Sequence, residues 1–396
     1  MVSQEMFQLG NKRSAIRELF EYGKMRAGIV GKENVYDFSI GNPSVPAPAC
    51  IEEAIAEIFA TEDSSAVHGY TSAQGDLSVR AGLARYMSEQ FGMPFTADNF
   101  YMTCGAAASL CISLKALTEE KTDEYIVIAP YFPEYKVFVE AAGGTFREVA
   151  PDKESFQIHF AELEQTIGST TKAVIINSPN NPTGAVYTAE TIRKLSELLT
   201  RKSEEYGHPI FILSDEPYRE IVYGGVEVPF IPQYYANTII CYSFSKVLSL
   251  PGERIGYILV PDQTEGCREI YTAVCGAGRA LGYVCAPSLF QKVVLKCLGK
   301  TSDMEVYKAN RDLLYDKLTS LGYRCVKPDG AFYLFMEALE SDAAAFCEKA
   351  KEFDLLLVAG DGFGCPGYVR ISYCVAKDML ERSFGAFEKL RAAYPG

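Results

Sequence analysis

The 396-residue sequence contains no tryptophan and only three histidines, and its twelve cysteines are scattered without a CxxC pair or a zinc-like spacing. Structural zinc sites need Cys and His ligands at characteristic spacings, so this pattern argues against a metal centre. It is typical of reduced thiols in the core of a cytosolic protein. No apolar run approaches the length of a membrane span, and the first residues lack the charged and apolar regions of a signal peptide. We therefore expect a cytoplasmic protein that binds neither metal nor membrane.

Positive charge is also scarce, because 38 lysines and arginines face 51 acidic residues and give a net charge of −13. A strongly acidic chain is repelled by phosphate backbones and anionic lipids, so nucleic acid and membrane surfaces are poor partners for it. The length exceeds what one small core can use, which favours one large domain with a smaller one beside it.

One stretch, at residues 242–257, combines a lysine with hydroxyl residues and an arginine. Apolar sequence on both sides predicts strand, short loop and strand, which puts Lys246 at a strand end, where sites in open α/β sheets lie. A lysine in a dry pocket can lose its proton and attack a carbonyl. Ser243, Ser245 and Arg254 are donors that suit a phosphate. An aldehyde that carries a phosphate is pyridoxal 5′-phosphate, so the stretch suggests this cofactor.

Buried strands alternate with helices through the first two thirds of the chain. Continuous apolar runs at 125–130, 173–176 and 210–213 alternate with helical patterns such as 77–91 and 189–206. This alternation predicts an α/β fold with a mostly parallel sheet covered by helices on both faces.

The pattern changes after residue 287, and the chain divides into three parts. Residues 1–47 read as an N-terminal arm and a segment that joins the small domain, 48–287 as a large cofactor-binding domain, and 288–396 as a smaller α+β domain. We expect a helical stretch over 288–321 at its start and a closing helix over 377–394.

Polar or aromatic residues follow several of the expected strands. Asp215 ends one strand, where an acid is either a helix cap or a functional group. Tyr131 and Phe132 follow another, and either ring could stack on a planar ligand or fill the core. Residues 100–110 read as a strand, a tight turn and a helix start, where small residues leave backbone N–H groups free for an anion.

Four motifs together resemble the class I and II aminotransferases, which are pyridoxal-phosphate enzymes of fold type I, and within them the aspartate aminotransferase group. The motifs are NNPTG at 180–184, DEPY at 215–218, SFSK at 243–246 with an arginine eight residues later, and RISY at 370–373. Each motif is weak alone, but four in this order and spacing are specific. The likeness runs from about Phe38 to the C-terminus.

The resemblance implies a role for each motif residue. Lys246 would hold the cofactor as a Schiff base and then shuttle a proton, while Asp215 would keep the pyridine nitrogen protonated. Asn181 and Tyr218 would hydrogen-bond the ring's hydroxyl oxygen, and Phe132 would stack on the ring. The phosphate would be held by Ala106, Ala107, Ser243, Ser245 and Arg254, with Tyr70 from the neighbouring subunit of a homodimer that shares its active sites. The α-carboxylate of the substrate would be bound by Gly41, Asn181 and Arg370.

The implied function is transfer of an amino group between an L-amino acid and a 2-oxo acid by ping-pong chemistry. Aspartate or glutamate with 2-oxoglutarate is the expected pair, with Arg279 as a candidate for the side-chain carboxylate. Aromatic or alanine donors are the alternative, because several aspartate-specific relatives stack a tryptophan on the ring and this chain has none. A second departure, alanine at 359 where relatives usually have proline, we expect to be harmless.

Two other readings share these motifs. One is a carbon–sulfur β-lyase or a decarboxylase on the same scaffold, which would use the same lysine, aspartate and phosphate site. The other is a non-catalytic sensor that binds the cofactor and carries a DNA-binding module. The acidic charge and the short segment of about forty residues before the fold disfavour the sensor.

Overall fold

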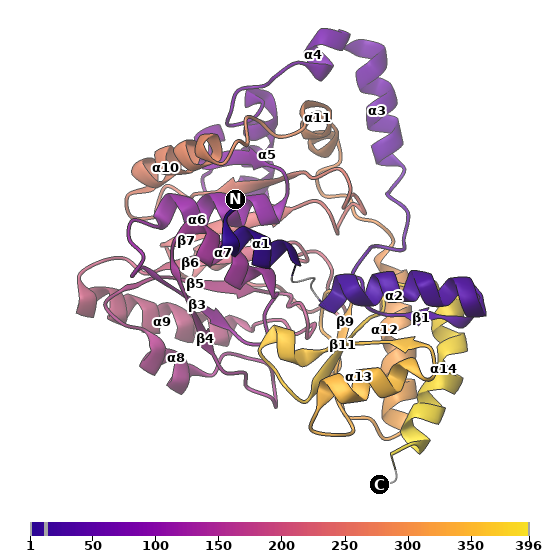
Figure 1. Cartoon of the computed structure of the whole chain (residues 1–396). Coiled ribbons are helices and arrows are strands. Elements are labelled where there is room, and N and C mark those ends of the chain that lie inside the picture. Colours follow the sequence, from indigo (N-terminus) through magenta and orange to yellow (C-terminus); the bar gives the residue numbers. More distant parts are fainter. Residues whose placement is uncertain (1, 12–14, 395–396) are drawn as a thin grey trace.

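The computed structural model describes residues 2–11 and 15–394 and divides into a large sheet covered by helices and a smaller sheet beside it (Figure 1). The large sheet has seven strands in the order β2-β8-β7-β6-β5-β3-β4. Its strands are β2 Phe100–Thr103, β3 Glu124–Ile128, β4 Thr145–Val149, β5 Thr171–Asn177, β6 Phe211–Glu216, β7 Thr238–Ser243 and β8 Gly256–Leu259. All neighbouring strands are parallel except β8, which runs antiparallel to both β2 and β7.

Helices cover both faces of this sheet, because the strands alternate apolar side chains between two cores. One core joins alternate strand residues to α6 Ala106–Leu117, α7 Glu134–Ala142 and α10 Cys267–Ala280. The opposite face is covered by α3 Cys50–Thr61, α4 Ser64–His68, α5 Leu77–Phe91, α8 Phe160–Thr166, α9 Ala189–Tyr206 and α11 Ser288–Lys296. The predicted mostly parallel sheet between helical layers is confirmed.

The smaller part is built on a three-stranded antiparallel sheet in the order β11-β12-β9. It contains β9 Tyr333–Glu337, β11 Val358–Ala359 and β12 Tyr368–Ser372, with helices α12 Met304–Ser320, α13 Ala343–Lys351 and α14 Lys377–Ala392. The described residues also form four short 3-10 helices, of which the last belongs to the smaller part: η1 Lys32–Asn34, η2 Ala97–Asn99, η3 Ile231–Gln233 and η4 Gly360–Phe363. The predicted α+β character of this part is confirmed.

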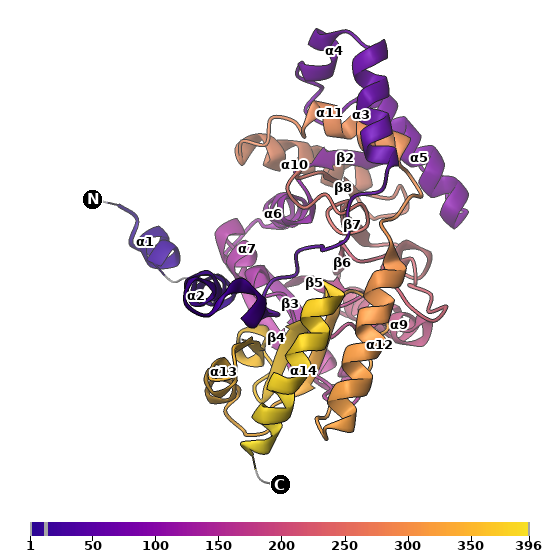
Figure 2. The ribbon, with the colours of Figure 1, turned by 90° about the vertical axis from the view of Figure 1, so that its right-hand side faces the viewer.

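Of the N-terminal segment, α2 lies against the smaller part, whereas α1 stands apart from it in Figure 2 (compare Figure 1). Its helices are α1 Gln4–Asn11 and α2 Ala15–Val30, and residues 1 and 12–14 of the expected arm lie outside the described residues. Strand β1 Tyr36–Asp37 pairs in parallel with β10 Leu355–Leu356, so residues far apart in sequence are joined at this point.

The expected helical stretch over 288–321 is wrong as one helix, because the chain breaks between α11 and α12. Gly299 has a φ of +73°, which ends the helical path, and Asp303 then caps α12 by accepting a hydrogen bond from the backbone N–H of Glu305. Helix α11 packs on α3 and α5 over the large sheet, whereas α12 packs in the core of the smaller part. The domain boundary at residue 287 stays a prediction.

No helix in residues 2–11 or 15–394 is both long and apolar enough to cross a membrane.

Candidate active site

Most of the expected site residues meet in a cavity of about 280 Å³ between the large sheet and the smaller part. Parallel strands β5, β6 and β7 all end at this edge, so the residues at their carboxyl ends converge there. Strand β12 of the smaller part contributes to the opposite wall. The predicted residues that line the cavity are Gly41, Ala106, Ala107, Phe132, Asn181, Asp215, Tyr218, Ser243, Ser245, Lys246, Arg254 and Arg370.

Lys246 lies on the loop that follows β7, and its amine reaches into this cavity. Its Nζ donates to the backbone carbonyl of Gly41 at 2.8 Å and lies 5.7 Å from the centre of the Phe332 ring. Burial lowers the pKa of the Lys246 amine to about 8, an effect that Cys374 opposes and that the nearby charges of Arg254 and Arg370 reinforce. A lysine with this pKa is neutral in roughly one tenth of the molecules at pH 7, far more than a solvated lysine, and nucleophilic attack requires the neutral amine.

Asp215, at the end of β6, is buried, and only one of its two carboxylate oxygens has a hydrogen-bond partner in the described chain. The Tyr135 hydroxyl donates to Oδ2 at 2.5 Å, whereas Oδ1 is buried and has no hydrogen-bond partner within the described chain. Burial raises the pKa of the Asp215 carboxyl to about 7, an effect that the Tyr135 hydrogen bond opposes. A cationic N–H donor at Oδ1 would satisfy this oxygen and stabilise the carboxylate.

A cradle for an anion forms where α6 begins. Gly105 caps the helix with a φ of +87°, and a Cβ added there would lie 2.8 Å from Nη2 of Arg254. The Arg254 Nη1 donates to the Ser245 hydroxyl at 3.2 Å, and the Ser243 hydroxyl donates to the same Ser245 oxygen at 2.8 Å. Two hydroxyls, one guanidinium and the first N–H groups of a helix therefore face one cavity, which is the donor set of a phosphate site.

Arg370 of β12 is 2% exposed and pairs with no carboxylate in the part of the chain that the structure describes. Its Nη1 donates to Asn181 Oδ1 at 3.0 Å and its Nη2 to the Ser39 carbonyl at 2.5 Å, while Nε has no partner. The guanidinium lies 4.7 Å from the Tyr333 ring centre and 5.0 Å from that of Phe363. A buried cation without a counter-ion is costly, so this geometry favours an anionic ligand.

Glycine is required at position 41 by a close approach. A Cβ added to Gly41 would lie 1.9 Å from the Tyr333 hydroxyl oxygen, and the same hydroxyl is 2.9 Å from that of Tyr218. The backbone of Gly41 can therefore reach both Lys246 and the cavity wall.

The two aromatic candidates separate clearly. Phe132 lines the cavity, whereas the Tyr131 hydroxyl donates to Glu148 at 2.6 Å and its ring packs edge-on against Phe146. The Phe132 ring also packs edge-on against the Tyr135 ring, with the ring centres 5.7 Å apart. Phe132 therefore lies beside the tyrosine that donates to Asp215.

Two expected residues do not lie at this cavity. Tyr70 follows α4 and is 89% exposed, and Arg279 is exposed in the last turn of α10. Neither lines the cavity of its own chain.

Several residues of the site were not predicted from the sequence. Tyr135 and Tyr333 bond to Asp215 and Tyr218, Asn177 donates to the Asp215 carbonyl at 2.9 Å, and Ile16 of α2 forms part of the wall. Tyr135 and Asn177 stand beside motifs already noted, so proximity in sequence could have pointed to them.

Comparisons with known proteins agree with this geometry. The family model described as aminotransferase class I and II matches residues 33–387. The chain belongs to this family.

Relatives and solved structures give the same result over nearly the whole chain. A crystal structure of an aminotransferase from Eubacterium rectale is 64% identical, covers all of both chains and superposes with a TM-score of 0.98. The aspartate aminotransferase of Thermotoga maritima is 30% identical over 372 residues, which cover 92% of this chain and 93% of the relative. The aspartate aminotransferase of Thermus thermophilus with maleate is 26% identical, with a TM-score of 0.85 over 98% of this chain and all of the other.

The aminotransferase resemblance, the fold type and the enzyme class predicted from the motifs are confirmed. The cofactor of the family is pyridoxal 5′-phosphate, and the cavity fits it on three independent features. The free Oδ1 of Asp215 suits a protonated ring nitrogen, the Gly105 cradle suits the phosphate, and Lys246 can take the aldehyde.

Proposed function

We propose that this aminotransferase moves amino groups between aspartate or glutamate and 2-oxoglutarate, and that the residues lining the cavity hold the cofactor and the substrate. One observation carries the assignment of roles. A desolvated lysine, a carboxylate oxygen without a partner and an arginine without a counter-ion line one cavity. Each of these groups lacks the ligand that would complete it, and an amino acid together with the cofactor supplies all three.

When bound, the cofactor supplies an aldehyde that accepts the amino group and a ring that accepts electrons. Lys246 would hold this aldehyde through its Nζ, and the same Nζ, once free, would take the proton from the substrate Cα. Burial favours the neutral amine that this step needs. Asp215 keeps the ring nitrogen protonated through its free Oδ1, while Tyr135 holds the carboxylate in place.

Asn181 and Tyr218 complete the surroundings of the ring. Because Asn181 Oδ1 accepts from Arg370, the amide Nδ2 is left as a donor for the ring's hydroxyl oxygen. Tyr218 shares its hydroxyl with Tyr333 and can donate to the same oxygen. The N–H groups of Ala106 and Ala107, with Ser243, Ser245 and Arg254, hold the phosphate.

Arg370 binds the α-carboxylate that all amino acids share, with the backbone of Gly41 opposite. Its guanidinium is already fixed by two hydrogen bonds and two aromatic rings, so little ordering remains when the substrate binds. A fixed carboxylate orients the Cα–H bond toward the Lys246 amine, which is a positioning effect.

The choice of aspartate is supported by the relatives, several of which are named aspartate aminotransferases, and by the maleate that accompanies one solved structure. A side-chain carboxylate needs a second cation, and Arg279 of the same chain is too exposed to serve its own cavity. Arg279 of a neighbouring subunit is our candidate.

A donor panel tests the substrate proposal. Aspartate, glutamate, phenylalanine and alanine are each mixed with the holoenzyme, and the loss of the aldehyde form is followed in the visible spectrum. We expect the two dicarboxylates to react fastest, and Arg279→Ala to slow them selectively. If phenylalanine or alanine reacts faster than the dicarboxylates, the proposed substrate is wrong, but the aminotransferase reaction class stands. Release of a carbon–sulfur fragment without amino transfer would favour the β-lyase.

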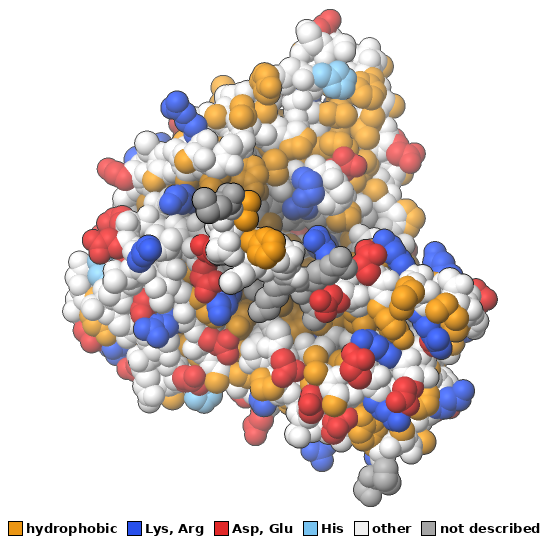
Figure 3. All heavy atoms as spheres, viewed as in Figure 1, with side chains coloured by type: hydrophobic (Ala, Val, Ile, Leu, Met, Phe, Trp, Pro, Cys, Tyr) orange, Lys and Arg blue, Asp and Glu red, His pale blue; other side chains and the backbone are white. Residues whose placement is uncertain are grey.

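We also propose a homodimer whose two active sites are shared. Tyr70 is 89% exposed, and Phe59 of α3 and Leu77 at the start of α5 are also exposed large hydrophobics. Hydrophobic side chains gather on the upper part of the face in Figure 3. Exposed apolar residues on a surface otherwise rich in mixed charges suit an interface.

Mixing two inactive variants tests this proposal. Tyr70→Asp places a carboxylate beside the phosphate, and Lys246→Ala removes the anchor. In a mixed dimer, one active site carries both substitutions and the other carries neither. Random exchange makes only part of the dimers mixed, and each mixed dimer has one intact site of two. We therefore expect roughly a quarter of the wild-type activity to return. Subunit exchange shown by mass spectrometry with no return of activity would place Tyr70 outside the partner's site.

A cytoplasmic location remains our proposal for this enzyme. It is supported by the twelve cysteines, all of which lie in the described residues and are free of disulfides.

A further inference from the structure

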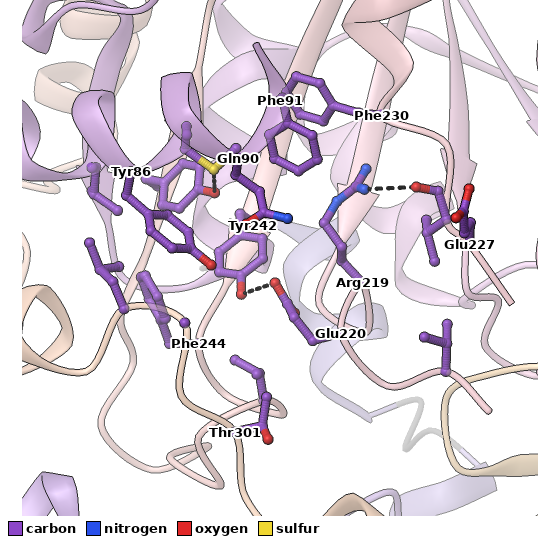
Figure 4. A pocket seen from close by; sticks show the side chains of 18 of the residues that line it. Tyr86, Gln90, Phe91, Arg219, Glu220, Glu227, Phe230, Tyr242, Phe244 and Thr301 are labelled. Carbon is purple, nitrogen blue, oxygen red and sulfur yellow. Dashed lines mark hydrogen bonds between the residues drawn. The ribbon is translucent and has the colours of Figure 1, made fainter. Parts of the chain in front are cut away.

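A second cavity, of about 600 Å³, lies on the other side of the segments that form the active site. Its walls are the end of α5, the segment 219–234 after β6, and the turn 297–301 between α11 and α12. Figure 4 shows it from close by, with Glu220 and Arg219 side by side in its wall. It is larger than the active-site cavity, and no role assigned above uses it.

The two cavities share the same two chain segments. After β6, Pro217 and Tyr218 line the active site, whereas the next residues, Arg219 and Glu220, line the second cavity. Around β7 the residues alternate, with Ser243, Ser245 and Lys246 on the active site and Tyr242, Phe244, Val247 and Leu248 on the second cavity. A ligand in the second cavity would therefore pack against the back of the segment that carries Lys246.

Aromatic side chains dominate the lining of this cavity. The rings come from Tyr86, Phe91, Phe230, Tyr234, Tyr242, Phe244 and Tyr257. Arg219 already uses two of them, since its guanidinium lies 5.5 Å from the Phe91 ring centre and 5.3 Å from that of Phe230. That arginine is satisfied, because it pairs with the buried Glu216 at 2.5 Å and donates to two backbone carbonyls. Tyr242 and Tyr257 stack on each other at 4.8 Å, so Tyr86 and Phe244 are the rings that we consider for contact with a cation.

Glu220 is the acid of the cavity whose carboxylate has a buried oxygen without a partner among the described residues. Its Oε1 accepts a hydrogen bond from the Tyr242 hydroxyl at 2.8 Å, whereas the buried Oε2 has no partner among the described residues. No lysine or arginine of the described chain forms an ion pair with Glu220, and the neighbouring Arg219 is held by Glu216. Burial raises the pKa of the Glu220 carboxyl, although Tyr242 and Arg219 oppose this shift.

We propose that this cavity is a binding site for an organic cation, with the ammonium group at Glu220 and an apolar or aromatic body against the rings of Tyr86 and Phe244. A cation at this place would satisfy the free carboxylate oxygen and gain from the ring faces at the same time. An anion would meet the unpaired charge of Glu220, and an uncharged ligand would leave its free oxygen without an ionic partner.

Titration calorimetry of the holoenzyme with benzyltrimethylammonium tests the proposal. A quaternary ammonium ion cannot react with the cofactor aldehyde, so imine formation cannot contribute to the signal. We expect saturable binding of this cation and much weaker binding of benzyl alcohol, its uncharged counterpart. Glu220→Gln should weaken the cation about tenfold or more, as expected for loss of a buried charge partner. Glu227→Gln is the matched control, because Glu227 lines the same cavity but is exposed, and it should change the Kd little.

Two results would overturn the proposal. If the wild type and Glu220→Gln bind the cation with equal affinity, the Glu220 carboxylate does not recognise it. If saturating maleate displaces the cation, the cation binds in the active site. If Glu220→Gln does not fold, a crystal structure of the wild-type holoenzyme with the cation decides. Density between Tyr86, Phe244 and Glu220 supports the site, and density only elsewhere contradicts it.

Discussion

Asp215 and Glu216 are consecutive buried acids at the end of β6, but they belong to two differently built regions. On the back of the sheet, Glu216 accepts from the Ser214 hydroxyl at 2.7 Å and from Arg219 at 2.5 Å, so both oxygens are engaged. On the active-site side, Asp215 accepts only from Tyr135, and Oδ1 has no partner in the described chain. The same strand thus carries one acid with both carboxylate oxygens hydrogen-bonded by the described chain and one acid with a free carboxylate oxygen.

The basic residues show the same contrast. Lys202 is buried in α9 and donates to Glu205 at 2.8 Å, whereas Lys246 donates only to a backbone carbonyl. Arg311 pairs with Asp312 at 2.7 Å, whereas Arg370 pairs with no acid of the described chain. Buried charges are costly unless they are compensated, so the complete pairs can be attributed to the fold and the incomplete groups to a ligand.

The largest expected difference in kcat is between substitutions of the two buried lysines. Lys246→Ala removes both the anchor of the cofactor and the base, so we expect kcat to fall by at least about 10⁴-fold while the cofactor still binds non-covalently. Lys202→Ala is the control and should leave kcat close to the wild-type value. Steady-state kinetics and the spectrum of the bound cofactor measure both effects. Near wild-type turnover of Lys246→Ala would contradict the assignment.

The two acids should separate catalysis from stability. Asp215→Asn cannot keep the ring nitrogen protonated, so kcat should fall about 10²–10³-fold with a much smaller change in KM. Glu216→Gln leaves Arg219 buried without a full counter-charge, which should lower the free energy of unfolding by about 3–5 kcal/mol. The folded fraction of Glu216→Gln should retain its kcat. A change of KM alone in Asp215→Asn would make that residue a structural cap instead.

The two arginines give a smaller contrast. Arg370→Lys keeps the charge but loses the planar fork, so kcat/KM should fall by about tenfold to a hundredfold for every amino acid alike. Arg311 is similarly buried but has a complete set of partners within the chain, so Arg311→Lys should leave kcat/KM unchanged. A loss confined to one substrate would place Arg370 at the side-chain pocket.

The sequence predicts those parts of the molecule that local chemistry determines. The helix expected over 77–91 agrees with α5 at both ends, because Asp76 caps its start and Gly92, with a φ of +65°, ends it. Lys246 and Asp215 also lie at strand ends as expected, since a continuous apolar run precedes each of them.

The sequence does not predict what depends on distant segments. Tyr135 is 80 residues from Asp215 and Tyr333 is 115 residues from Tyr218, so no local pattern could pair them. The missed break after α11 has a different origin, because the apolar pattern on both sides suits helices and the signals that separate them, Gly299 and the capping Asp303, occupy a short polar segment.

The smallest expected effect, a pH dependence of about tenfold, tests the contrast between the lysines without any mutation. Burial lowers the pKa of Lys246 to about 8, whereas the hydrogen bond to Glu205 raises that of Lys202. An amine becomes nucleophilic when it loses its proton, so reactivity rises with pH and levels off above the pKa. With a pKa of about 8, roughly one tenth of the Lys246 amines are neutral at pH 7 and roughly nine tenths at pH 9.

The initial rate at which the apoenzyme takes up pyridoxal 5′-phosphate should therefore rise about tenfold from pH 7 to pH 9, with a midpoint near 8. The visible absorbance of the covalently bound cofactor measures this rate, and Lys246→Ala should give no such signal at any pH. A solvated lysine has a pKa near 10.4, so its rate would still be rising steeply at pH 9. A midpoint near 10 would mean that the Lys246 amine is hydrated before the cofactor binds. The difference between the two buried lysines would then come from the ligand and not from the folded chain.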